Sequence, residues 1–363
     1  MRAATPMRIA QIAPLLESVP PQTYGGTERV VSYLTEALVE LGHDVTLFAS
    51  GDSTTRARLV PVVERSLRLD PSHPDWLART TMMLDQVFAS ADEFDVMHFH
   101  VDFLHYPLVR RCATPSLTTM HGRLDLPDLA PLHRHFREQP LVSISNAQRK
   151  PLARSRWVAT VHNGLPQALY RFHAAPADYF AFVGRISPEK RVDRAIEIAR
   201  ATGTRLRIAA KVDRVDQEYF ERDIEPLLNH PLVEFIGEID ESVKNEFIGQ
   251  ARAVLFPIDW PEPFGMVMIE ALACGTPVVA YRCGSVTEVI EHGVTGFIVG
   301  DQSQAIEAAR DIGRIDRGAC RRAFERRFTA HRMAQQYVEV YQALSGARAT
   351  GDDEAADEAD QRA

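Results

Sequence analysis

Twice along this chain, short apolar runs alternate with stripes of apolar residues at helical spacing. The first run, residues 7–13, is followed by a glycine-containing loop and by an apolar stripe from Val30 to Leu41, which Gly42 ends. Continuous apolar runs are typical of buried parallel strands, and apolar residues three or four positions apart are typical of a helix on a sheet. Together with the apolar run at 45–49, this order predicts the start of a Rossmann-like domain.

A second series of strands and helices begins after residues 166–178, which contain prolines and show little periodicity. Strands alternating with helices predict an α/β protein with two doubly wound parallel sheets. With 363 residues, the chain has the length of two domains. Further strands are expected at 96–99, 116–119, 141–144, 158–161, 179–183, 206–210, 233–236, 253–256, 278–280 and 297–299.

These patterns predict an N-terminal domain at 7–165 and a C-terminal domain at 178–328. A final helix is expected at 329–345, because apolar residues such as Met333, Tyr337 and Tyr341 fall on one stripe. Residues 346–363 are small and acidic and have little apolar area to bury, so we expect them to form a disordered tail.

The distribution of charge is uneven. The formal net charge of −8 argues against a general nucleic-acid-binding protein, which normally carries a basic domain. Residues 108–156, however, contain nine Lys or Arg and three acids. Two interpretations are open: a solvated basic face, or a surface that attracts an anionic acceptor or a membrane.

Cysteine usage and hydropathy bear on the compartment. The four cysteines are widely spaced without a C-x-x-C pair, which fits free thiols in a reducing compartment. Residues 1–6 are not an apolar run, and no apolar stretch reaches the ~18–20 residues that span a bilayer. We therefore expect a cytoplasmic protein, peripheral to the inner face of the membrane if the basic segment binds it.

The strongest chemical signal is a pair of glutamates eight positions apart, Glu262 and Glu270, on either side of a helix start at Gly265. Their carboxylates can recognise two hydroxyl-bearing rings that a pyrophosphate joins. The N–H groups of Phe264, Gly265 and Met266, at the positive end of the helix dipole, are expected to face the phosphates. Glu270 alone would equally suit an ordinary acidic helix.

Two cations precede this pair. Arg185 and Lys190 follow a predicted strand, at the turn where open α/β sheets bind ligands. Cations at this place stabilise a departing pyrophosphate without proton transfer. A surface Arg or Lys is usually only solvated. The assignment of these two cations to a pyrophosphate therefore depends on the glutamates downstream.

At these residues the sequence resembles glycosyltransferase family 4. Glu262 and Glu270 match its E-x7-E signature, and three further blocks occur in the family's order: Gly25-Gly26-Thr27-Glu28, Gly184-Arg185-Ile186-Ser187-Pro188-Glu189-Lys190 and Gly237-Glu238-Ile239-Asp240. The resemblance covers about residues 7–345. It implies retaining enzymes of the GT-B fold, with two Rossmann-like domains facing across a cleft and a C-terminal helix that crosses back to the first.

The resemblance also implies roles for individual residues. Arg185 and Lys190 would bind the pyrophosphate, Glu262 the sugar and Glu270 the ribose, with His121 near the sugar. Gly25 and Gly26 would approach the donor closely, and Gly237 and Ile239 belong to the loop that contacts the base. The family generally needs no metal or cofactor. His98, His100 and Asp102 could suggest metal ligands, but no cysteine or further histidine lies at zinc spacing.

We therefore expect a retaining glycosyltransferase that moves a hexosyl group from a nucleotide-diphosphate sugar, UDP-glucose first and GDP-mannose second. The acceptor, a sugar, a lipid-linked group or a small molecule, is open. The alternatives are a GT-B epimerase or phosphorylase and a catalytically silent nucleotide-sugar-binding protein. The sequence departs from the family at Ser285 and Thr287, where G-G-x-P-E is common, and residues 52–92 match no known pattern.

Overall fold

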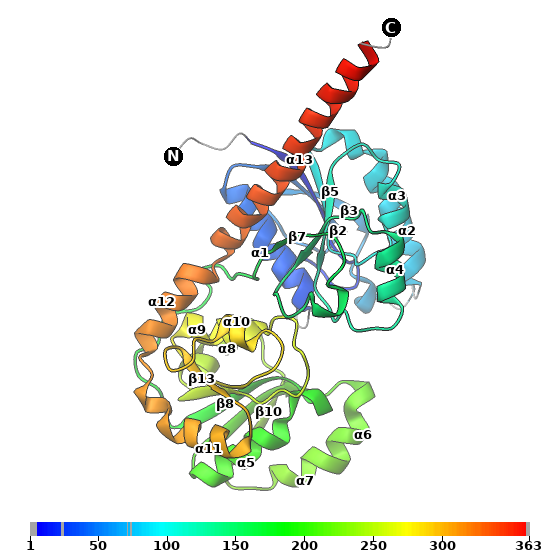
Figure 1. The fold of residues 1–363 in the computed structure, drawn as a ribbon. Coiled ribbons are helices and arrows are strands. Elements are labelled where there is room, and N and C mark those ends of the chain that lie inside the picture. The colour runs from blue at the N-terminus through cyan, green and yellow to red at the C-terminus, as the bar shows by residue number, and fades with distance from the viewer. Residues whose placement is uncertain (1–5, 23–24, 71, 73–74, 361–363) are drawn as a thin grey trace. The chain divides into compact units, whose positions relative to one another are not determined.

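The structure is a computed structural model that describes residues 6–22, 25–70, 72 and 75–360, without side chains beyond Gly346. The chain divides into two compact units, and each is built on one parallel sheet with helices packed on it (Figure 1). Unit 1 comprises the chain up to residue 144, residues 149–164 and the chain from residue 330. Unit 2 comprises residues 145–148 and 165–329.

Unit 1 contains a seven-stranded sheet in the order β3-β2-β1-β4-β5-β6-β7. Its strands are β1 (Arg8–Ile12), β2 (Asp44–Ser50), β3 (Arg58–Val63), β4 (Val96–Phe99), β5 (Ser116–Met120), β6 (Leu141–Ser143) and β7 (Trp157–Thr160). Its helices are α1 (Gly26–Glu40), α2 (Trp76–Ala89), α3 (Tyr106–Val109), α4 (Leu129–His135) and α13 (Ala330–Asp360).

Unit 2 contains a six-stranded sheet in the order β10-β9-β8-β11-β12-β13. Its strands are β8 (Tyr179–Arg185), β9 (Arg205–Lys211), β10 (Val233–Gly237), β11 (Ala253–Phe256), β12 (Val278–Tyr281) and β13 (Gly296–Val299). Its helices are α5 (Val192–Thr202), α6 (Gln217–Tyr219), α7 (Glu225–Leu228), α8 (Glu241–Gly249), α9 (Met266–Cys274), α10 (Val286–Val289), α11 (Gln302–Asp311) and α12 (Arg317–Arg327). Counted from its own first strand, this sheet has the Rossmann order 3-2-1-4-5-6, as do the first six strands of unit 1.

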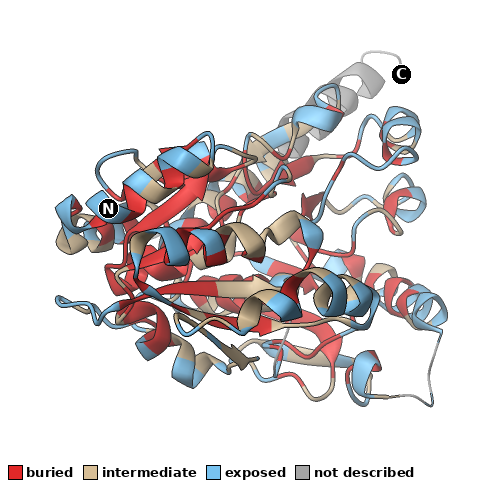
Figure 2. Cartoon of the chain, turned by 90° about the horizontal axis from the view of Figure 1, so that it is seen from below, coloured by how far each residue is buried: buried red, intermediate tan, exposed pale blue. Residues whose placement is uncertain are grey.

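The central strands form the cores. All residues of β4, β5, β11 and β12 are buried, as expected for strands that have helices on both faces of a parallel sheet (Figure 2). The prediction of two Rossmann-like α/β sheets is therefore confirmed.

The stretch that matched no pattern, residues 52–92, adds an edge strand and a helix to unit 1. Strand β3 pairs only with β2 among the described strands, and it contains Pro61. An edge strand tolerates proline because one side of its backbone makes no ladder bonds. Asp75 caps α2 by accepting a hydrogen bond from the amide of Ala78. Sequence patterning missed β3 because its residues are half-buried or exposed rather than alternating.

The last helix, α13, returns to unit 1 and packs against α1 (Figure 1), which confirms the predicted return of the C-terminal helix. Tyr337 and Tyr341 are buried there. The helix extends to Asp360, beyond the expected end at 345, and alanine and glutamate have high helix propensity in this stretch. Disorder of the tail at 346–363 stays a prediction, and residues 361–363 lie outside the described chain.

Two arginines of α12 hold the helices of unit 2 together. Arg317 donates to the carbonyl oxygens of Gly249 and Ala251, where α8 ends. Arg321 donates to the carbonyl oxygen of Ala273 in the last turn of α9. Cations satisfy the unpaired carbonyls of a helix C-terminus and complement its dipole. These contacts fix the far end of α9, the helix that carries Glu270.

Candidate functional site

In both units, the predicted site residues lie where the strand order reverses. Ligands of open α/β sheets bind outside the carboxyl ends of the strands at this point. In unit 2 the reversal falls between β8 and β11, and in unit 1 between β1 and β4. Arg185 is the last residue of β8, and Glu262 lies in the loop after β11.

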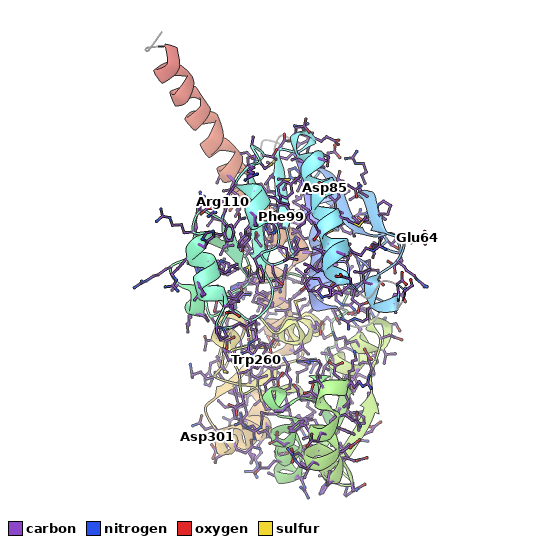
Figure 3. All side chains as sticks on the ribbon, turned by 90° about the vertical axis from the view of Figure 1, so that its right-hand side faces the viewer. Glu64, Asp85, Phe99, Arg110, Trp260 and Asp301 are labelled. Carbon is purple, nitrogen blue, oxygen red and sulfur yellow. The ribbon has the colours of Figure 1, made fainter. Side chains whose placement is uncertain are left out.

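Glu262 is part of a compact cluster in unit 2. Lys190, at the end of a short 3₁₀ turn after β8, donates a hydrogen bond to Glu262 Oε2. The indole of Trp260 (Figure 3) donates to the same oxygen at 2.9 Å. The Lys190 ammonium lies 5.5 Å from the centroid of the Trp260 ring, within cation–π range. Lys190 and Glu262 are only 18% and 13% exposed, so this pair is largely removed from water.

Arg185 is held by carboxylates on two sides. Its guanidinium lies 3.2 Å from Glu189 and 3.3 Å from Asp213. Burial tends to raise the pKa of Asp213, but hydrogen bonds from Lys211 and Arg185 outweigh it and hold this pKa below its ordinary value. The guanidinium therefore keeps a fixed position at the end of β8.

Glu270 forms a second, separate ion pair. It lies on α9 with its side chain 3% exposed, and Lys244 Nζ is 2.6 Å from each carboxylate oxygen. Lys244 comes from α8, whose first turn is capped by Asp240. The predicted base-contacting loop leads directly into this helix: Gly237 ends β10 with a φ of 76°, and Ile239 is half-buried.

The anion-binding hypothesis, which stays a prediction, concerns the start of α9. Gly265 has a φ of 79°, and no side chain caps the helix. Phe264 is buried, and Met266 begins the helix. At Gly284 a Cβ atom would lie 2.4 Å from the backbone of Glu262, so the loop after β12 packs directly on the Glu262 segment.

The loop in which the sequence departs from the family supports this segment. The hydroxyl of Ser285 donates to the carbonyl oxygen of Phe264 at 2.7 Å. The hydroxyl of Ser145 donates to the carbonyl oxygen of Pro263 at 2.6 Å. Glu288 accepts hydrogen bonds from the backbone amides of Asn146 and Ala147. Two serine hydroxyls thus fix the carbonyls on either side of the Pro263–Phe264 bond.

In unit 1, His121 follows β5 directly and is half-buried. Its Nε2 lies 2.8 Å from Nδ1 of His100. Burial lowers the pKa of His121 to about 4, so the ring is neutral at pH 7. Gly25 and Gly26 stand at the start of α1 in the same unit. His98 and His100 have both ring nitrogens hydrogen-bonded to protein side chains.

Sequence reasoning identified Arg185, Lys190, Glu262 and Glu270, of which the structure joins Lys190 to Glu262. It missed Lys244, Trp260 and the serines at 145 and 285, because no sequence motif connects these residues to the groups that they contact. Lys244 lies 26 positions before Glu270, and no spacing rule connects them.

Comparisons with known proteins point to one class. A model described as glycosyl transferases group 1 matches residues 172–319, and one described as glycosyltransferase family 4 matches residues 24–158. The phosphatidyl-myo-inositol mannosyltransferase of Mycolicibacterium smegmatis is 26% identical over 385 residues, covering 94% of this chain and 95% of that protein. The structure of AviGT4, a glycosyltransferase involved in avilamycin A biosynthesis, has a TM-score of 0.72 and 26% identity, covering 94% of this chain and 98% of the other. The structure of HepE of Anabaena in complex with UDP-glucose has a TM-score of 0.70 at 17% identity, covering 93% of this chain and 100% of the other. At this identity, the similarity supports a shared fold and no shared activity.

Two Rossmann-like sheets with a helix returning to the first are the architecture of the GT-B fold. Both halves of the chain match glycosyltransferase models. The chain belongs to glycosyltransferase family 4, and it is a retaining enzyme that uses a nucleotide-sugar donor.

Proposed function

We propose that this enzyme transfers a hexosyl group from a nucleotide sugar to an anionic acceptor. UDP-glucose is the first candidate donor and GDP-mannose the second. The acceptor hydroxyl attacks the anomeric carbon on the face from which the phosphate departs. The bond from that carbon to the phosphate oxygen breaks, and the phosphate takes the hydroxyl proton. Arg185, Lys190 and the first amides of α9 stabilise the departing diphosphate. Gly25 and Gly26 let the backbone approach the donor closely.

The observation that carries this proposal is the Lys190–Glu262–Trp260 cluster at the reversal point of unit 2. It presents a fixed cation beside a fixed carboxylate, both shielded from water. A carboxylate recognises sugar hydroxyls, and an ammonium recognises phosphate. Glu270, oriented by Lys244, accepts the ribose hydroxyls, and the loop with Gly237 and Ile239 contacts the base.

The acceptor side of the proposal rests on unit 1. Arg134 and Arg137, on and beside α4, are exposed and form no ion pair among the described residues, whereas Arg110 (Figure 3) pairs with Glu138. None of the described helices has the length and apolarity to span a membrane. The mannosyltransferase relative is named for a phosphatidyl-inositol acceptor, which is lipid-linked and anionic. We propose that basic residues of the segment 108–156 contact such an acceptor or the inner face of an anionic membrane.

The donor is tested with a panel of nucleotide sugars by thermal shift. A ligand present at 100 times its Kd adds about 2.7 kcal/mol of stability. UDP-glucose is expected to give the largest shift. Product analysis without acceptor separates transfer from epimerase or phosphorylase chemistry, and failure of turnover over a broad acceptor panel would indicate a silent binding protein.

The role of Arg185 is tested by Arg185→Ala, which should lower kcat about 10²–10³-fold and weaken binding of free UDP or GDP. The matched control is Arg207→Ala, because Arg207 also pairs with a carboxylate in unit 2, that of Glu234. An unchanged rate together with unchanged nucleotide affinity in Arg185→Ala would exclude the pyrophosphate role.

A further inference from the structure

One face of the unit 1 sheet carries a continuous network of buried polar side chains. Gln11 lies on β1 and is in register with His98 on β4, and His100 follows two residues later. Thr119 on β5 and His121 just beyond it lie on the same face, which α13 covers with two tyrosines. The described members are between 0% and 3% exposed except His121: Gln11, His98, His100, Thr119, Tyr337 and Tyr341.

Short hydrogen bonds connect this network without interruption. His121 Nε2 lies 2.8 Å from His100 Nδ1, and His100 Nε2 lies 2.8 Å from the amide oxygen of Gln11. The amide nitrogen of Gln11 donates to the hydroxyl of Tyr341 at 3.1 Å. That hydroxyl lies 2.8 Å from His98 Nδ1, and His98 Nε2 lies 2.7 Å from the hydroxyl of Thr119.

All three imidazoles are neutral. Burial lowers the pKa of His98 and His100 well below the ordinary value and lowers that of His121 to about 4. A neutral imidazole has one N–H donor and one bare acceptor nitrogen, so the partner of one nitrogen determines the state of the other.

The orientation of Gln11 therefore determines the tautomer of His121. The amide oxygen of Gln11 can only accept, so His100 Nε2 must carry its proton. His100 Nδ1 is then bare and must accept from His121 Nε2–H. This leaves Nδ1 of His121 without a proton, able to accept a hydrogen bond from a ligand. Reversing the amide of Gln11 would reverse each of these bonds. In the structure the amide nitrogen faces the Tyr341 hydroxyl, which accepts its hydrogen bond, and the amide oxygen faces His100.

We propose that Tyr341, Gln11 and His100 form a relay that fixes His121 as the Nε2–H tautomer, so that Nδ1 accepts a hydrogen bond from a hydroxyl of the donor sugar. This inference rests on the proposed function, which places His121 at the sugar. The three relay residues are positioning residues: they act on the substrate only through His121. The relay also connects the last helix of the chain to a substrate-binding side chain, because Tyr341 lies on α13.

The tautomer is measured directly by NMR on the full-length chain with ¹⁵N-labelled histidine, using His121→Asn to assign the His121 signals. Long-range ¹⁵N–¹H correlations should show His121 Nδ1 as unprotonated and Nε2 as protonated. A His121 ring protonated on Nδ1, or an equal mixture of tautomers, would overturn the proposal. This measurement requires no turnover.

A matched set of variants tests the consequence. Gln11→Met removes the amide that determines the tautomer, and Tyr341→Phe removes only the hydroxyl that accepts from the amide nitrogen. Tyr337→Phe is the control: it makes the same change on α13, but its hydroxyl bonds Thr119 and lies outside the relay. We expect kcat/KM to fall about tenfold in Gln11→Met, the equivalent of one net hydrogen bond, less in Tyr341→Phe and not in Tyr337→Phe.

A double-mutant cycle separates positioning from general damage. In the His121→Ala background, Gln11→Met should cause no further loss, whereas a merely structural role would reduce activity in both backgrounds. If His121→Ala leaves kinetics unchanged while NMR shows the expected tautomer, the proposed role at the sugar fails and the relay stands. If His121→Ala lowers the rate but Nδ1 carries the proton, the relay fails and the proposed function stands.

Discussion

The two sheets share one strand order, yet the chemistry at their reversal points differs. In unit 2, the side chains there are charged and paired, as in Lys190 with Glu262 and Arg185 with Asp213. In unit 1, Gln11, His98 and His100 occupy the equivalent place, and the network is neutral. The same topology therefore supports an ionic site in one unit and a hydrogen-bonded site in the other.

This difference follows from what each unit is proposed to hold. A diphosphate carries full charges, which only fixed cations and amide dipoles can balance. Sugar hydroxyls are neutral, and both the carboxylate of Glu262 in unit 2 and the neutral ring of His121 in unit 1 are proposed to bind them. The neutral ring discriminates between hydroxyls by the direction of its donor and acceptor. An ionic site tolerates small displacements because charge acts over distance, whereas a hydrogen-bonded site depends on orientation. The neutral network is accordingly the better buried of the two.

The largest expected effect concerns α13, which completes only the neutral site. Truncation after Thr329 removes Met333, Tyr337 and Tyr341, all buried in unit 1. At about 1.5–3 kcal/mol for each large side chain, unit 1 should lose about 5 kcal/mol or more and fail to fold stably. Thermal denaturation measures this loss. Removing only 346–363 is the control and should leave the melting temperature and activity nearly unchanged. A stable, active chain ending at Thr329 would contradict this reading.

The second prediction is that low pH destabilises unit 1 more than unit 2. A histidine with a lowered pKa binds fewer protons when folded than when unfolded, so stability falls as pH drops from 6.5 towards the folded pKa. For His121, with a pKa of about 4, the loss is about 3 kcal/mol at most, and His98 and His100 act in the same direction. Hydrogen exchange should show peptides of unit 1 losing protection before those of unit 2. His121→Asn should reduce this pH dependence, and an unchanged dependence would show that the histidine does not couple to folding.

The ionic site was readable from the sequence, and the neutral one was not. Arg185, Lys190, Glu262 and Glu270 lie within 86 consecutive positions, in blocks whose order is itself a signal. The neutral network draws on residues 11, 98, 100, 119, 121, 337 and 341. His98 and His100 alternate along one strand, and Tyr337 and Tyr341 fall on one helical stripe, but no local rule connects the two pairs. Only the return of α13 does so.

The third prediction tests whether the two carboxylates of the ionic site act differently. The structure favours glutamine over alanine here, because Glu270→Ala would leave the ammonium of Lys244 buried without its partner. Glu262→Gln should lower kcat about 10–100-fold, the equivalent of a lost charged hydrogen bond, and Glu270→Gln should mainly raise the donor KM about tenfold. Steady-state kinetics with the true donor separate the two. Glu234→Gln, on an exposed pair of the same unit, is the control. Wild-type kinetics in both site variants would remove these assignments.

The smallest expected effect concerns two surface arginines of unit 1 that form no ion pair among the described residues. Arg134 and Arg137 are exposed, and Arg111, Lys150 and Arg154 add further exposed cations. Exposed charges act over about 8–10 Å at physiological salt, so attraction to anionic lipid should weaken as salt rises. Reversing Arg134 and Arg137 to Glu should weaken sedimentation with anionic vesicles about tenfold, since each basic residue near such a surface contributes about 1 kcal/mol before screening.

The control reverses two exposed arginines of unit 2, Arg200 and Arg205, which changes the net charge equally and should leave binding intact. Equal binding to neutral and anionic vesicles, or none at low salt, would exclude the membrane. If the acceptor is instead a soluble anion, activity on it should decline as salt rises. The reversal of Arg134 and Arg137 should cause the same decline, and the reversal of Arg200 and Arg205 should not.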